Sequence, residues 1–249
     1  MKNSNVIVQS TFGPIIINLN DTGIGGHVVK TGYWALEDIK LIIDMMKIQL
    51  RSREKLVFYD VGANIGTHSL AIAKTFEERV FVRSFEAQRI IFNMLCGTVA
   101  INGLLNVHCH NLAVAQVSGL EIEFDGLSYD QPNAFGSLEL LSPFENGDNM
   151  KMSKLTKEKV ITTTLDAFDE HVDFIKMDIE GMEDKAIKGM KNLIKRSRPI
   201  CYIEIAKTDR IELLNFFLES DYVGFQKIGD ILLLPSEMDI GIKGLHRVF

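Results

Sequence analysis

From residue 56 onward the chain alternates short apolar runs with segments of helical periodicity, and this alternation restricts the fold more than any other feature of the sequence. Such strand–helix units are typical of α/β proteins in which helices cover a largely parallel sheet. The apolar runs predict strands over residues 56–59, 80–85, 107–114, 174–177 and 200–204. The periodic segments predict helices over residues 68–76, 90–101, 183–194 and 210–218.

The two ends of the chain depart from this alternation. At the N-terminal end the patterns predict a hairpin over 6–8 and 15–19, a glycine-rich loop over 21–26 and a helix over 34–50. Near the C-terminus, residues 222–227 and 231–235 predict a second hairpin, because Gly229 and Asp230 supply its turn.

A long polar stretch interrupts the alternation between the third and fourth strands. Residues 121–124 and 160–165 are strand-like, whereas 125–159 contain several glycines and prolines. A loop of this length inside a compact domain is usually a lid, a binding loop or disorder. We predict one domain over residues 1–249, divided into an N-terminal hairpin-and-helix extension (1–53) and a core (55–235) with 125–159 as a loop insertion.

Composition narrows the choice of partner and compartment. The chain has 27 Lys and Arg residues against 33 Asp and Glu, a net charge of −6, so its overall field repels a phosphate backbone and argues against nucleic acid. Cys96, Cys109 and Cys201 are too few and too scattered for a disulfide framework, which favours a reducing cytoplasm. No apolar stretch approaches the roughly 20 residues that cross a bilayer, so we expect no membrane span.

The segment from Asp60 to Gly66 lies where the first core strand ends and a helix begins. Gly62 and Gly66 permit a tight turn and close approach of a ligand to the backbone, and the helix start offers free N–H groups. The Gly-x-x-x-Gly spacing differs from the Gly-x-Gly-x-x-Gly dinucleotide fingerprint, which argues against a nicotinamide enzyme.

Glu86 follows the second core strand, twenty residues beyond Gly66, where a carboxylate can accept hydrogen bonds from both ribose hydroxyls. Together with the glycine turn it predicts a site for a nucleoside-bearing cofactor. The structural alternative is a plain glycine turn in which Asp60 caps the helix and Glu86 is merely solvated.

Lys176, Asp178 and Glu180 alternate by two, so they share one face of an extended strand at its carboxyl end. Ligands of open α/β sheets bind at that edge, so these three residues are candidates for the reacting centre. Asp178 or Glu180 would alternatively stabilise the start of the following helix. Glu204, at the end of the next strand, belongs to the same edge, where it could pair with Lys176 or form an ordinary salt bridge.

The histidines carry less information. His108 and His110 share a face of one strand, but because no third ligand has suitable spacing we predict no metal site. His68 could touch the cofactor but is expected to pack at the surface, and His27 could close over the site from its glycine-rich loop.

The turn at 60–66, the segment Ser84-Phe85-Glu86-Ala87 and the segment 176–181 together resemble the FkbM-type family of S-adenosylmethionine-dependent methyltransferases, over about residues 55–205. The resemblance implies a Rossmann-like class I methyltransferase fold: a seven-stranded, mostly parallel sheet with an antiparallel last strand and helices on both faces. The family usually has proline soon after the acid of the second strand, whereas this chain has Ala87-Gln88-Arg89.

The resemblance also assigns roles to individual residues. Asp60, Gly62, Asn64 and Gly66 would hold the methionine moiety of the cofactor, Glu86 the ribose, and Asn111, Leu112 and Ala113 would lie near the adenine, with Ala63 and Ala87 as further cofactor contacts. The catalytic candidates are Lys176, Asp178, Glu180 and Glu204.

The activity implied is methyl transfer to a hydroxyl oxygen of a small molecule or sugar. Asp178 or Glu180 would take the hydroxyl proton, Lys176 would orient that carboxylate, and loops 125–159 and 23–34 would choose the acceptor. The sequence requires no metal, although three acidic side chains at one edge would suit Mg²⁺. Two alternatives stay open, namely a catalytically inactive cofactor-binding module and an NAD-type nucleotide-binding protein.

Overall fold

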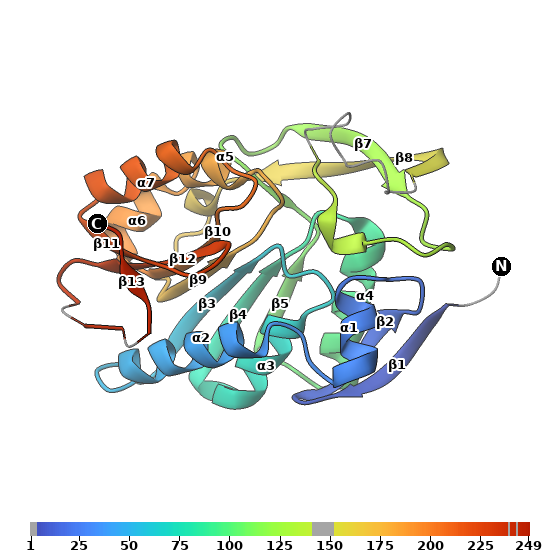
Figure 1. The fold of residues 1–249 in the computed structure, drawn as a ribbon, viewed down its shortest axis with the longest axis horizontal. Coiled ribbons are helices and arrows are strands. Elements are labelled where there is room, and N and C mark those ends of the chain that lie inside the picture. Colours follow the sequence, from blue (N-terminus) through green and yellow to red (C-terminus); the bar gives the residue numbers. More distant parts are fainter. Residues whose placement is uncertain (1–3, 141–151, 239, 243) are drawn as a thin grey trace.

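The computed structural model describes residues 4–140, 152–238, 240–242 and 244–249. A central sheet of eight strands has the order β13-β11-β12-β10-β9-β3-β4-β5 (Figure 1). Its parallel strands are β3 (Leu56–Val61), β4 (Val80–Phe85), β5 (Val107–His110), β9 (Phe174–Met177) and β10 (Ile200–Glu204). The antiparallel edge consists of β11 (Tyr222–Gln226), β12 (Asp230–Pro235) and β13 (His246–Arg247).

The large mixed sheet confirms the predicted α/β class, but the expected number of seven strands is wrong. The eighth strand is the two-residue β13, which pairs with β11 through Phe225 and Gln226. The C-terminal hairpin of β11 and β12 is confirmed, and β12 lies between β10 and β11. So short a strand, with two exposed residues, has no apolar run that could mark it in the sequence.

Helices cover both faces of the sheet, as Figure 1 shows. On one face lie α2 (Leu36–Gln49), α3 (Thr67–Phe76) and α4 (Arg89–Ile101), and on the other α5 (Glu183–Lys188), α6 (Lys191–Ser197) and α7 (Arg210–Glu219). Phe58 and Phe174 belong to the first core, whereas Tyr59 and Ile175 belong to the second. This alternation follows from the two-residue period of a strand, and it explains why strands covered on both faces are apolar runs.

The predicted helix over 183–194 is wrong as a single element, since α5 ends at Lys188 and α6 begins at Lys191. A Cβ at Gly189 would lie 2.3 Å from the carbonyl oxygen of Ala115. The chain therefore breaks where its backbone packs directly on a neighbouring segment, a contact that helical periodicity does not reveal.

The predicted strand over 107–114 is divided. Its first half is β5, whereas β6 (Ala113–Val114) leaves the main sheet and pairs with β8 (Met152–Thr163), which also pairs with β7 (Glu121–Leu127). The insertion boundaries 125–159 are therefore wrong, because strand structure continues to Leu127 and resumes at Met152. The part of the insertion from 141 to 151 lies outside the described residues.

The N-terminal extension contains the predicted hairpin, β1 (Asn5–Ser10) with β2 (Gly13–Asn18), and the helix α2. The predicted loop over 21–26 is wrong in its second half, because α1 (Ile24–Thr31) begins there. The Asp21 carboxylate accepts the backbone N–H groups of Gly23 and Gly25, so it fixes the start of this glycine-rich helix. No helix among the described residues is both long and apolar enough to cross a membrane.

Candidate active site

A cavity lies at the carboxyl ends of β3, β4, β9 and β10, the edge of the sheet where open α/β proteins bind ligands. Several segments bound it: the turn after β3, the turn after β4, residues 112–114, the end of β9 with the residues after it, Glu204 at the end of β10, and an outer wall built from α1 and the segment 127–140. The predicted site residues that line it are Gly62, Ala63, Asn64, Glu86, Ala87, Leu112, Ala113, Lys176, Asp178, Glu180 and Glu204.

Gly62 has a φ of 75°, and a Cβ there would lie 1.8 Å from the carbonyl oxygen of Asp178. The first glycine of the turn is therefore required because the ends of β3 and β9 touch, rather than because a ligand must approach. Gly66 has a φ of 91°, and a Cβ there would meet Leu95 at 2.8 Å. Gly66 thus serves the packing of α3 on α4 and does not line the cavity.

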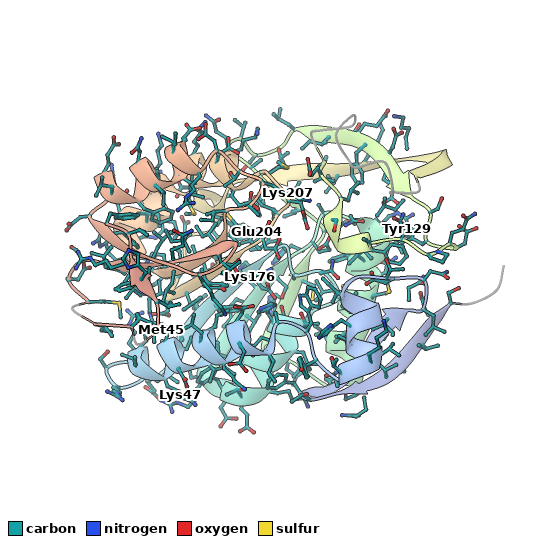
Figure 2. The ribbon with its side chains drawn as sticks, viewed as in Figure 1. Met45, Lys47, Tyr129, Lys176, Glu204 and Lys207 are labelled. Atoms are coloured by element: carbon teal, nitrogen blue, oxygen red, sulfur yellow. The ribbon has the colours of Figure 1, made fainter. Side chains whose placement is uncertain are left out.

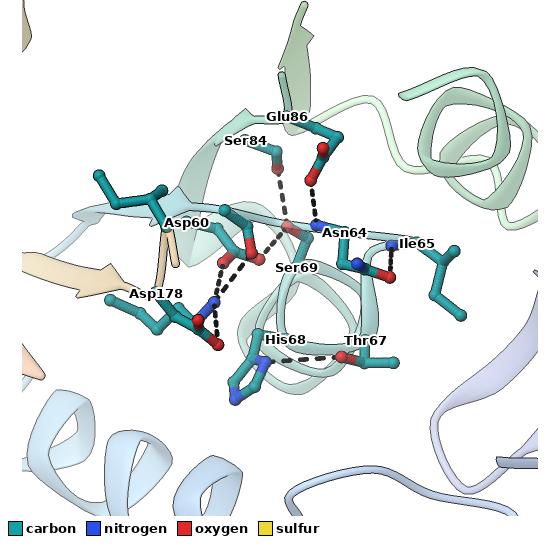
Figure 3. Close-up of polar contacts among 12 residues, drawn as sticks. Asp60, Asn64, Ile65, Thr67, His68, Ser69, Ser84, Glu86 and Asp178 are labelled. Carbon is teal, nitrogen blue, oxygen red and sulfur yellow. Dashed lines mark hydrogen bonds and ion pairs between the residues drawn. The ribbon is translucent and has the colours of Figure 1, made fainter. Parts of the chain in front are cut away.

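Asp60 does not line the cavity, and Figure 3 shows its contact with Ser69. Its side chain is fully buried, and Oδ2 accepts the Ser69 hydroxyl at 2.6 Å. The Ser69 and Ser84 hydroxyls are 2.7 Å apart, so a chain of polar groups joins β3, α3 and β4. On the other side Lys176 Nζ lies 3.7 Å from Asp60 Oδ1. Asp60 therefore supports the site through Lys176 and Ser69.

Glu86 is buried at the cavity wall, so the merely solvated alternative is wrong. Its Oε2 accepts the N–H of Asn64 at 2.9 Å and its Oε1 accepts the N–H of Gln88 at 2.8 Å. These two bonds fix the carboxylate between the turn after β3 and the start of α4. Burial raises the pKa of Glu86 to about 7 despite the two N–H donors.

Asp178 and Glu180 lie beyond β9, which ends at Met177, so the shared strand face predicted for them with Lys176 is wrong. The cavity nevertheless brings all three together. Lys176 Nζ donates to the Gly62 carbonyl at 2.9 Å and lies 3.7 Å from Asp178 Oδ2. Burial alone would lower the pKa of Lys176, but the carboxylates of Asp178 and Asp60 raise it above its ordinary value.

Glu183 stabilises the turn that carries the two carboxylates. Its Oε1 accepts the N–H of Ile179 at 2.7 Å and its Oε2 that of Gly181 at 3.1 Å. Glu180, which has a φ of 56°, forms an ion pair with Lys207 instead of capping α5. The alternative in which Asp178 or Glu180 caps this helix gains no support, because α5 has no side-chain cap.

Glu204 lines the cavity, but Lys176 pairs with Asp60 and Asp178 rather than with it. Burial, together with the nearby carboxylates of Asp178 and Glu180, raises the pKa of Glu204 to about 8. Figure 2 labels Lys176, Glu204 and Lys207 at the carboxyl edge of the sheet.

The outer wall consists of two segments that are far apart in sequence. Thr22 donates its N–H to the Asn133 carbonyl, and Asn133 donates its N–H to the Asn20 carbonyl. The Asp21 carboxylate, which fixes the start of α1, also interacts with the backbone of Phe135. The N-terminal extension and the segment 127–140 therefore form one continuous wall.

Gln88 fastens this wall to the start of α4. Its side chain donates to the Phe135 carbonyl at 2.9 Å and accepts the Tyr129 hydroxyl at 3.1 Å. Gln88 lies in the segment where the family usually has proline, and a proline side chain could make neither bond. The chain therefore lacks the usual proline in the segment that contains Gln88, and the structure shows the role of Gln88 whereas the sequence does not.

Other residues lie differently from their predicted places. Asn111 does not line the cavity, since its side chain donates to the carbonyls of Glu86 and Ala87. His68 is buried and lines the cavity, so surface packing was wrong, and burial lowers its pKa to about 4. His27 packs against the rings of Tyr33 and Trp34 and does not line the cavity.

The sequence did not single out several lining residues. They are Thr67, Val114 and Met182, together with Ile24, Trp34, Ala134, Gly136, Ser137, Leu138 and Leu140 of the loops 23–34 and 125–159, which were expected only as whole segments to choose the acceptor. Within the described residues no group of three His, Cys, Asp or Glu side chains could hold a metal ion, so nothing supports Mg²⁺.

The arrangement of the sheet and the position of the cavity are those of a class I methyltransferase fold. A model of the methyltransferase FkbM domain matches residues 60–225, which is more than half of the chain. The chain belongs to this FkbM methyltransferase family, as its three motifs predict.

The chain is similar to several solved structures. The methyltransferase FkbM from Methylobacillus flagellatus KT is 20% identical over 72% of this chain, with a TM-score of 0.51, and this chain spans 43% of its length. The tRNA (uracil-54, C5)-methyltransferase of Pyrococcus abyssi, in complex with S-adenosyl-L-homocysteine, is 11% identical over 93% of this chain and 43% of its own, with a TM-score of 0.48. TYW2 of M. jannaschii, in complex with AdoMet, is 15% identical over 94% and 85%, with a TM-score of 0.45. No curated protein matches the chain.

Proposed function

We propose that this protein transfers the methyl group of S-adenosylmethionine to a hydroxyl oxygen of a small molecule or sugar. The observation that carries the proposal is one cavity, in a chain of the FkbM family, that joins the buried Glu86 carboxylate to the Lys176–Asp178 ion pair. The cofactor supplies an electrophilic methyl group on a sulfonium.

The residues of the cavity fit this cofactor. Each oxygen of Glu86 accepts one backbone N–H and keeps a second lone pair, so the carboxylate can still accept the two ribose hydroxyls. Leu112 offers apolar surface for a purine on the same side of the cavity. Gly62, Ala63 and Asn64 offer a turn whose shape the contact with Asp178 fixes.

Asp178 is the residue that we propose to take the proton of the acceptor hydroxyl. Its side chain is 43% exposed, in contrast to the buried Lys176 beside it, so an acceptor can reach it. Lys176 positions this carboxylate from below, and Asp60 in turn holds Lys176. A positioned base of this kind contributes about 10²- to 10⁴-fold to a proton-transfer step.

Glu180 and Glu204 are secondary candidates at the same edge. Glu180 is engaged by Lys207, which also contacts Glu139, so these ion pairs join the turn after β9 to the outer wall. We propose that this wall selects the acceptor, since binding residues commonly lie on segments above a rigid scaffold. The low cysteine content further leads us to propose a cytoplasmic location.

Calorimetry with S-adenosylhomocysteine and, in parallel, with NAD tests the proposal. We expect the first compound to bind and NAD to show no binding. Preference for NAD would establish the nucleotide-binding alternative instead. Binding of S-adenosylmethionine without turnover across a broad panel of hydroxylated acceptors would favour the inactive module.

A further inference from the structure

The carboxyl groups that line the cavity differ in whether the protein itself provides them with partners. Glu86 accepts two backbone N–H groups, Asp178 pairs with Lys176, and Glu180 pairs with Lys207. Glu204 is the exception among the described lining residues. Its Oε2 is buried without a hydrogen-bond partner, and no ion pair reaches it.

The surroundings of Glu204 carry an excess of negative charge. Four further carboxyl groups act on it electrostatically: those of Asp178 and Glu180 after β9, of Glu183 on α5, and of Asp230 at the start of β12. Lys176 on β9 is the one lysine or arginine among the described lining residues, and Asp60 and Asp178 already flank it. A further positive charge would therefore be stabilised beside Glu204, whereas a phosphate or carboxylate would be repelled.

The position of Glu204 associates it with the acceptor rather than with the nucleoside. Glu86 follows β4 and Glu204 ends β10, and β3 and β9 lie between these strands. Neighbouring strands are about 4.8 Å apart, so the two carboxyl groups lie at opposite ends of the cavity. Asp178, the proposed base, lies between them after β9.

We propose that Glu204 determines acceptor specificity by binding a protonated amine, so that the acceptor carries an amino group close to the hydroxyl that is methylated. This inference rests on the proposed function. An ammonium group has three N–H donors and a compact charge, so it can bind the part of the Glu204 side chain that lines the cavity and offset the surrounding carboxylates.

Binding of an amine beside Glu204 should also release a proton. With its pKa near 8, the Glu204 carboxyl is largely protonated at pH 7 before the amine binds. An ammonium ion favours the ionised carboxylate, so binding expels that proton to the buffer. A neutral hydroxyl in the same place has no such effect.

Calorimetry on the full chain saturated with S-adenosylhomocysteine tests the inference with two matched pairs of probes. Glucosamine is compared with glucose, and trans-2-aminocyclohexanol with cyclohexane-1,2-diol, at pH 7 in two buffers that differ in ionisation enthalpy and lack primary amines. We expect each amine to bind about tenfold more tightly than its partner, the typical gain of a charge-assisted contact. Proton release should accompany amine binding, and glucose 6-phosphate should bind more weakly than glucose.

The variant Glu204→Gln keeps the size of the side chain and removes its charge. It should bind S-adenosylhomocysteine like the wild type and lose both the preference for amines and the proton release. Glu121→Gln, at an exposed carboxylate on β7 that pairs with Lys159, is the matched control and should keep both.

Several results would overturn the inference. They are equal affinity within both pairs, lack of binding by both amines, or a preference that survives Glu204→Gln. A loss of S-adenosylhomocysteine binding in Glu204→Gln would assign the residue to the cofactor instead. Failure of the wild type to bind S-adenosylhomocysteine would contradict the proposed function itself, and is thereby distinguished from failure of the inference.

Discussion

The two ends of the cavity contrast in how they hold their carboxyl groups. At one end, Glu86 accepts N–H groups from Asn64 and Gln88 and is fixed by the backbone. At the other, Glu204 has no partner among the described residues. The first end is therefore complete before any ligand arrives, whereas the second is completed by what binds there.

This contrast has a structural origin. The Glu86 end is built by two consecutive strand–helix turns, in which local backbone geometry supplies the donors. The Glu204 end is assembled from β10, β12 and the turn after β9, which all bring carboxylates to the same edge. A chain can tolerate such a concentration of acids only where burial and mutual repulsion raise the pKa values, as at Glu204 and Glu183.

The largest expected effect comes from a substitution that forces apart β3 and β9, the two strands that lie between the two ends of the cavity. Gly62→Val would place Cβ 1.8 Å from the Asp178 carbonyl oxygen, so the ends of β3 and β9 must separate. We expect a loss of at least about 4 kcal/mol in the free energy of unfolding, together with loss of S-adenosylhomocysteine binding. Urea unfolding and calorimetry measure the two effects.

Gly103→Val provides the matched control. Gly103 has a φ of 63°, but a Cβ there would have nothing within 4 Å, so only the cost of positive φ remains, about 1–3 kcal/mol. Equal costs at positions 62 and 103 would show that backbone conformation alone, and not the contact with Asp178, explains the glycine at Gly62.

Asp178→Asn tests the part of the cavity where we propose that the acceptor binds. The variant keeps the shape of the side chain but cannot accept a proton, so we expect turnover to fall by about 10²-fold or more. The affinity for S-adenosylhomocysteine should change little, since Glu86 and the turn after β3 stay intact. Single-turnover kinetics with an acceptor identified by a metabolite screen provide the measurement, and full activity would remove Asp178 from the mechanism.

Glu86→Ala tests the end of the cavity at which backbone N–H groups hold the carboxylate. It removes the proposed contact with the ribose and leaves the N–H groups of Asn64 and Gln88 without their acceptor. Hydrogen bonds to a charged group contribute about 1.5–3 kcal/mol, so the affinity for S-adenosylhomocysteine should fall about tenfold or more. Unchanged affinity, measured by calorimetry, would mean that the proposed orientation of the cofactor is wrong.

The smallest expected effect is on the pH dependence of stability at the incomplete end. The pKa of Glu204 is about 8 in the folded chain and near 4.5 when unfolded, so the folded state binds the proton more tightly. Stability from this group therefore decreases as the pH rises between these values. Glu204→Gln should gain about 1 kcal/mol or more over the wild type between pH 5 and pH 8.

Urea unfolding at several pH values in this range detects the change. Some slope should remain in the variant, because burial also raises the pKa of Glu86 and Glu183 to about 7. Glu121→Gln should keep the slope of the wild type. An identical slope in Glu204→Gln would show that its carboxyl titrates normally.

The sequence predicted well those features that depend on local pattern. The strands β3, β4, β9 and β10 are apolar because they are covered on both faces, and the turns after β3, β4 and β9 carry motifs of a few consecutive residues. Membership of the FkbM family followed from those motifs. Whether Asp60, Gly66 and Asn111 contact the cofactor stays a prediction, and none of the three lines the cavity.

Features that depend on contacts between distant segments could not be predicted. Gln88 bonds to Phe135 and Tyr129, more than forty residues later in the chain, and Gly62 is required by Asp178, which lies much further away. The ion pairs of Lys176 could not be predicted either, because distances across three strands decide that it pairs with Asp60 and Asp178 and not with Glu204. Sequence spacing predicts that such residues lie near the site, but it does not predict which partner each residue contacts.

The fastening of α1 to the segment 127–140 has a practical consequence for engineering. Asp21 holds the start of α1 and contacts the backbone of Phe135, yet the family match begins only at residue 60. In chimeras with a relative, α1 and the segment 127–140 should therefore be exchanged together, because either segment alone would pack against a surface from the other protein. Directed evolution of substrate scope would likewise need libraries that randomise both pieces at once.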